Sequence, residues 1–139
     1  MSSIATGGGK AMSAQLAETF NLVPPPDDAC ETAFLDAWKE GVRLTMSPSF
    51  FGAHSDLDIE RATRKKSLTP HLQIIRKKIV DLPISRSAMI AAMVSFYNPA
   101  EGAKLETKIQ CAGLGCLAKH LNPKQRECLS RLLLTYQGW

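Results

Sequence analysis

Apolar residues recur at spacings of three and four along much of the chain, which is the pattern of helices that bury one face. The first long helix is predicted to begin at Asp28, the N-cap of a capping box with Glu31, and to end near residue 45. A second stripe follows Thr69-Pro70, which indicates an N-cap and a first helical position, and it stops at Pro83. The apolar members of this stripe are Leu68, Leu72, Ile75, Ile79 and Leu82.

The segment from Ala88 to Tyr97 is apolar on almost every side. With Ser85 as its predicted cap, such a helix belongs at the centre of a bundle or at a subunit interface. Asn122-Pro123 indicates the start of a last helix, whereas Gly102 disfavours a helix over residues 99–110. Because no segment shows the alternating pattern of a strand, the sequence predicts an all-α fold, a compact helical bundle of five to seven helices.

The chain has 139 residues, of which 45% are hydrophobic and 22% charged, which fits one soluble domain with a single core. Residues 1–10 are rich in Ser and Gly and are predicted to be a flexible N-terminal tail, so residues 11–139 form a single helical domain. No apolar run is long enough to span a bilayer and no secretory signal is visible. We therefore expect a cytoplasmic protein with no membrane partner, whose four cysteines are reduced thiols.

Charge is distributed unevenly along the chain. Residues 1–60 carry a net charge of −6, whereas residues 61–139 carry +10. This asymmetry predicts either an anionic partner or two halves that attract each other. The candidate phosphate-binding residues are the basic side chains of the densest stretch, 61–86: Arg61, Arg64, Lys65, Lys66, Arg76, Lys77, Lys78 and Arg86.

Residues 65–97 combine a short basic segment, a helical stripe and a second helix that opens with Ile84-Ser85-Arg86-Ser87. This order resembles the ribbon-helix-helix family of DNA-binding proteins. In that family, a basic strand pairs with the same strand of a second subunit and enters the major groove, and two helices follow. The resemblance implies a strand at 65–69 and a first helix at 70–82.

Catalytic and metal chemistry have weaker signals in the sequence. Cys111, Cys116, His120 and Cys128 are spaced C-x4-C-x3-H-x7-C, which departs from the usual zinc-binding patterns, so we predict no metal and no cofactor while leaving zinc open. No phosphate-binding loop, nucleophile elbow or metalloprotease signature is present. We therefore expect the protein not to be an enzyme.

These observations favour a small, non-catalytic regulatory or accessory protein that binds nucleic acid through the basic residues of 61–86. The alternative is a helical adaptor or inhibitor that acts by protein–protein binding, with a homodimer as one form of it. In that alternative the binding surface is the acidic amino-terminal helix or the helix that contains Met89 and Met93.

Overall fold

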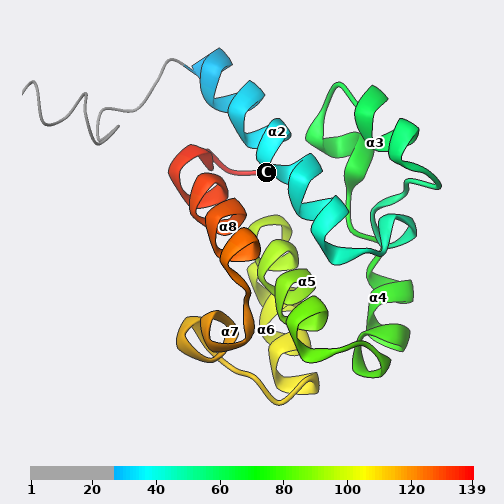
Figure 1. The fold of residues 1–139 in the computed structure, drawn as a ribbon, viewed down its shortest axis with the longest axis vertical. Coiled ribbons are helices and arrows are strands. Elements are labelled where there is room, and N and C mark those ends of the chain that lie inside the picture. Colours follow the sequence, from blue (N-terminus) through cyan, green and yellow to red (C-terminus); the bar gives the residue numbers. More distant parts are fainter. Residues whose placement is uncertain (1–26) are drawn as a thin grey trace, which may run out of the picture.

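The computed structural model describes residues 27–139, and every regular element in this range is helical (Figure 1). The predicted all-α fold is confirmed, whereas the tail predicted for residues 1–10 lies outside the described residues. The α-helices are α2 (Asp27–Thr45), α3 (Asp56–Arg61), α4 (Leu72–Lys78), α5 (Ile84–Tyr97), α6 (Pro99–Lys108), α7 (Leu114–His120) and α8 (Pro123–Thr135). Three short 3₁₀ helices connect them: η1 (Pro48–Phe51), η2 (Lys65–Leu68) and η3 (Ile79–Asp81).

Helix α5 lies at the centre of the bundle. It contacts α2, α6, α7 and α8, and Figure 1 shows it enclosed between these helices and the α4 region. All residues from Ser87 to Val94 are buried, including Met89 and Met93. The prediction of a central helix is therefore confirmed. The two methionines are core residues of a single chain, so the interpretation of this helix as a partner-binding surface is wrong.

A cluster of aromatic rings joins α2, η1 and the last residue, Trp139. Trp38 of α2 is fully buried, and its indole N–H donates a hydrogen bond of 2.9 Å to the carbonyl of Leu68. The centre of the Trp38 ring lies 4.8 Å from that of Trp139 and 5.9 Å from that of Phe51 in η1. Edge-to-face pairs of this kind contribute roughly 0.5–1.5 kcal/mol each beyond the area they bury. Trp139 is thus partly buried and packed against the core.

The apolar stripe of residues 68–82 is buried in part: Leu68, Ile75 and Ile79 belong to the core, whereas Leu72 and Leu82 are only partly buried against it. Leu68, Ile75 and Ile79 have at most 1% of their surface exposed. The start of the helix was predicted wrongly, because Thr69 takes an extended conformation and α4 begins only at Leu72. The N–H of His71 donates to the carbonyl of Phe50 at 2.8 Å, and this bond holds the preceding residues against η1.

Helix caps follow the sequence in some places and not in others. Ser55 accepts a hydrogen bond from the N–H of Asp58, and Asn122 forms a capping box with Gln125 at the start of α8. Ser85 is not a cap, because α5 begins at Ile84. Asp28 is not one either, because α2 begins at Asp27. Cap positions shifted by a single residue escape prediction because several nearby residues can start the same helix.

Within residues 99–110, where Gly102 was expected to weaken a helix, Pro99–Lys108 form α6. Asn98 caps this helix by accepting a hydrogen bond from the N–H of Glu101. Gly102 is buried where α6 crosses α5: a Cβ at this position would lie 2.7 Å from the Cα of Ser95. The glycine therefore permits the close approach of two helices. No helix of residues 27–139 has the length and apolar character needed to cross a bilayer.

Candidate nucleic-acid interface

The eight basic residues predicted to bind phosphate are carried by four consecutive elements. Arg61 ends α3, Arg64 to Lys66 enter η2, Arg76 to Lys78 form the last turn of α4, and Arg86 lies in the first turn of α5. Helices α3 and α4 lie on the same side of α2 and α5 (Figure 1). Basic side chains at the ends of α3 and α4 also complement the helix dipole. The structure divides the eight residues into two groups according to their partners.

Arg86 has a structural role. Its Nε donates to the carbonyl of Thr45 at 2.8 Å, and its Nη2 donates to the hydroxyl of Ser47 at 2.6 Å and to the carbonyl of Met46 at 3.2 Å. These bonds satisfy the carbonyls at the end of α2 and fix α5 to that turn. The guanidinium group of Arg86 is therefore hydrogen-bonded to other residues of the chain, and its assignment to phosphate binding is not supported.

Two further basic residues also have partners within the chain. Arg76 forms an ion pair of 2.5 Å with Glu101, to which Lys104 also donates at 3.2 Å. The hydrogen bonds from Arg76 and then Lys104 hold the pKa of the Glu101 carboxyl below its ordinary value. The Nζ of Lys65 donates to the carbonyl of Gly138 at 2.7 Å and lies 5.4 Å from the centre of the Trp139 ring. The ion pair of Arg76 joins α4 to α6, and the contacts of Lys65 join η2 to residues 138–139.

The other five residues are exposed and form no ion pair with any described residue: Arg61, Arg64, Lys66, Lys77 and Lys78. None of the described acidic residues of the first half, 27–60, forms an ion pair with them. Two of its acidic residues, Asp56 and Glu60, instead pair with Arg43 of α2 at 2.7 and 3.7 Å. Among the described residues, the charge asymmetry of the sequence is thus expressed as positive side chains in solvent.

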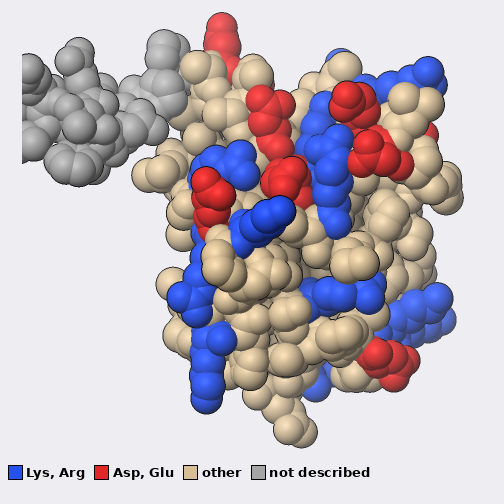
Figure 2. Space-filling model, in the orientation of Figure 1, with Lys and Arg blue, Asp and Glu red and all other residues tan. Residues whose placement is uncertain are grey.

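Figure 2 shows how charge is arranged on one face of the molecule. Basic side chains lie in separate groups, with acidic and uncharged surface between them. This face therefore carries no continuous basic stripe. Separate groups of this kind suit individual phosphate contacts, which position a protein without reading sequence.

The strand implied by the resemblance to ribbon-helix-helix proteins is absent. Lys65–Leu68 forms the 3₁₀ helix η2, in which Leu68 is buried and its carbonyl accepts the bond from Trp38. A segment held in this way cannot extend and pair with a second subunit without breaking core contacts. The implied base-reading ribbon is therefore wrong for residues 65–69.

The predicted cysteine and histidine set is only partly brought together. The structure joins Cys111 and Cys116 in a disulfide, whereas the sequence predicted reduced thiols. The ligand atoms of Cys111, Cys116 and His120 lie within 4.8 Å of one another. Cys128 lies elsewhere in the core, where its Sγ donates to the carbonyl of Ala37 at 3.1 Å and burial raises its pKa to about 11.

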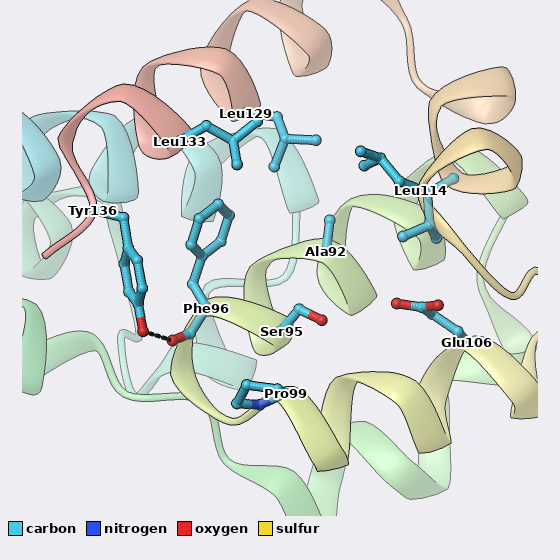
Figure 3. Close-up of a pocket in the computed structure, with 10 residues that line it drawn as sticks. Ala92, Ser95, Phe96, Pro99, Glu106, Leu114, Leu129, Leu133 and Tyr136 are labelled. Carbon is cyan, nitrogen blue, oxygen red and sulfur yellow. Dashed lines mark hydrogen bonds between the residues drawn. The ribbon is translucent and has the colours of Figure 1, made fainter. Parts of the chain in front are cut away.

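Sequence reasoning missed an apolar pocket of about 310 Å³ between α5, α6, α7 and α8 (Figure 3). Leu129 and Leu133 of α8 face Phe96 and Ala92 of α5 across it, and Glu106 lies at the end near Leu114. Leu133 is 58% exposed at the pocket. The pocket had no signal in the sequence because its walls come from four separate helices.

Comparison of the chain with protein-family models, with curated proteins and with solved structures finds no match in any of the three.

Proposed function

We propose that this protein is a non-catalytic regulatory or accessory protein that binds nucleic acid through phosphate contacts. The observation that supports the proposal is the group of five exposed basic side chains between Arg61 and Lys78 that lack an acidic partner among the described residues. Lys and Arg that neutralise phosphates gain affinity by releasing condensed counterions. A nucleic-acid ligand agrees with a cytoplasmic place of action, which is part of this proposal.

The proposal does not include base-specific readout. A recognition helix needs polar side chains that reach base edges, but the face of α5 that follows Arg86 is buried in the bundle. η2 and the last turn of α4 expose Lys66, Arg76, Lys77 and Lys78, and Lys and Arg are common phosphate-contacting residues. Binding should therefore depend weakly on nucleotide sequence.

The test is fluorescence anisotropy of a labelled random-sequence DNA duplex, with a single-stranded RNA as a second probe. Lys77→Glu/Lys78→Glu should weaken binding at least about tenfold, since each lost phosphate contact and each new repulsion act on affinity. The matched control is Lys108→Glu/Lys124→Glu, which changes the net charge equally at exposed positions outside the group. The proposal fails if wild-type protein binds neither probe, or if both variants lose affinity equally.

A second candidate function is a helical adaptor or inhibitor that acts by protein–protein binding, with a second copy of this chain as the first partner to test. The pocket of Figure 3 is bordered by the exposed side chains of Leu114 and Leu133, and Leu134 of α8 is also exposed. One patch with both a cavity and protruding leucines is suited to a self-complementary interface. Light scattering should then give twice the 15.2 kDa of one chain for wild-type protein and 15.2 kDa for Leu133→Asp. A monomeric wild type would exclude the homodimer form of this candidate.

A further inference from the structure

Three side chains that bind soft metal ions meet beside α7. Cys111 precedes this helix, Cys116 lies in its first half, and His120 is its last residue. Cys116 and His120 are four residues apart and therefore share one face of the helix. Their ligand atoms and the Sγ of Cys111 all lie within 4.8 Å of one another.

The loop that carries Cys111 is fixed by Glu106 of α6. The carbonyl of Glu106 accepts a 2.8 Å hydrogen bond from the N–H of Cys111, and its carboxylate accepts another of 2.8 Å from the N–H of Gly113. Gly113 has a φ of +92°, a conformation that glycine adopts without strain and that turns the chain into α7. The cluster is thus held by two elements and does not depend on a free loop.

The donor set and its exposure suit zinc. Two thiolates and one imidazole are the ligands that zinc prefers, and sites with three protein ligands keep a fourth position for water. Cys111 is buried, whereas Cys116 and His120 are only partly buried, so a fourth position would have access to solvent. Zn–S bonds of ~2.3 Å and Zn–N bonds of ~2.0 Å place tetrahedral ligand atoms about 3.6–3.8 Å apart. That separation requires the two sulfur atoms to move apart from their bonded position, while the imidazole nitrogen already lies within 4.8 Å of both sulfur atoms.

We propose that Cys111, Cys116 and His120 bind one zinc ion when the two cysteines are reduced, and that the disulfide is the alternative, metal-free state of the same site. Binding replaces the two thiol protons with zinc and releases these protons to solvent. Oxidation by a low-molecular-weight disulfide forms the Cys111–Cys116 bond and reduces that disulfide to two thiols. The zinc ion is released because neither sulfur remains a thiolate.

Cys128 does not belong to this site. Its thiol is fully buried against α2, and its raised pKa keeps it protonated near neutral pH. A protonated, enclosed thiol is a poor metal ligand and a poor nucleophile. The fourth member of the C-x4-C-x3-H-x7-C spacing is therefore a core residue, and the site has three protein ligands.

The test is isothermal titration of Zn²⁺ into the full chain after reduction with a phosphine and removal of the reductant under anaerobic conditions. The expected result is one zinc per chain in the reduced protein and none after oxidation. Cys116→Ser and His120→Ala should each weaken binding at least about 100-fold, since even outer-shell residues are worth 10–100-fold. His54→Ala is the matched control, because His54 is exposed and distant in sequence from the cluster. Its affinity should equal that of the wild type.

Absence of zinc binding by the reduced wild type would overturn the proposal. Zinc affinities of Cys116→Ser and His120→Ala equal to that of the wild type would also overturn it. Alkylation of the folded wild type followed by mass spectrometry provides a measurement that needs no variant. Zinc should protect Cys111 and Cys116 from the alkylating reagent. Equal labelling of these two cysteines with and without zinc would also refute the site. None of these outcomes depends on nucleic-acid binding.

Discussion

The close approach of α6 to α5 depends on the missing side chain of Gly102. A Cβ added there would lie 2.7 Å from the Cα and 2.9 Å from the backbone nitrogen of Ser95 in α5. Carbon atoms in contact are ordinarily about 3.5–4.0 Å apart. Gly102→Ala therefore produces an overlap of about 1 Å with backbone atoms, which no change of side-chain rotamer relieves.

The expected cost follows from two opposing effects. Overpacking of a core costs about 1–3 kcal/mol, and the upper end applies because two helices must separate. Alanine is favoured over glycine inside a helix by about 1 kcal/mol, which offsets part of the cost. We expect Gly102→Ala to lower the free energy of unfolding by about 2 kcal/mol. This is a large fraction of the roughly 5–15 kcal/mol that stabilises an ordinary domain.

Urea denaturation followed by circular dichroism measures this difference as a shift of the midpoint at constant slope. Gly115→Ala in α7 is the matched control, because no atom lies within 4 Å of a Cβ at that position. It should leave stability unchanged or raise it by up to about 1 kcal/mol. If Gly102→Ala were as stable as wild type, the packing of α6 against α5 described above would be incorrect.

Three further predictions concern the core and two perturbed groups. Ile75→Asp should abolish the cooperative thermal transition in circular dichroism, because it buries an unpaired charge in the 68–82 stripe. Burial raises the pKa of Cys128 to about 11, so the stability linked to its protonated thiol is fully present below the pKa of an unfolded cysteine and is lost as pH rises through about 11. In urea titrations between pH 9 and 11, the free energy of unfolding of wild-type protein should fall by up to about 2 kcal/mol through this group, and Cys128→Ala should lack that loss. Arg76→Ala should raise the pKa of Glu101, measured by carboxyl NMR titration, because the hydrogen bond that lowers it most is removed; an unchanged pKa would contradict this. The stability that Glu101 contributes above the ordinary carboxyl pKa is lost as pH falls through its lowered pKa, so the variant should depend less on acid pH.

Periodic apolar patterns gave the parts of the fold that sequence could predict. The stripe around Ile75 and the nearly uniform run from Ala88 to Val94 are both buried, because each pattern is a direct consequence of the surface that a helix must hide. Asn122-Pro123 was equally informative, since the asparagine cap and the proline act within a single turn.

Two of the errors arise from contacts with residues outside the local sequence pattern. Thr69 is not the cap of α4, because the hydrogen bond from the N–H of His71 to the carbonyl of Phe50 holds the residues before this helix. Gly102 lies within a helix because the backbone of Ser95 packs closely against it. Neither partner is a neighbour in sequence. For the candidate site, sequence located the basic residues but could not show that Lys65 and Arg86 are bound to backbone carbonyls.

The salt dependence of nucleic-acid binding shows whether the exposed basic residues of 61–78 contact phosphates, as proposed. Affinity for a labelled duplex should be measured by anisotropy from low to physiological salt. Five contacts predict a slope of log affinity against log salt of roughly −4.5, and Lys77→Ala should make it less negative by about 0.9. A slope near zero would mean that these residues do not contact phosphates. The same would follow if Lys77→Ala left the slope unchanged while the control Lys108→Ala altered it.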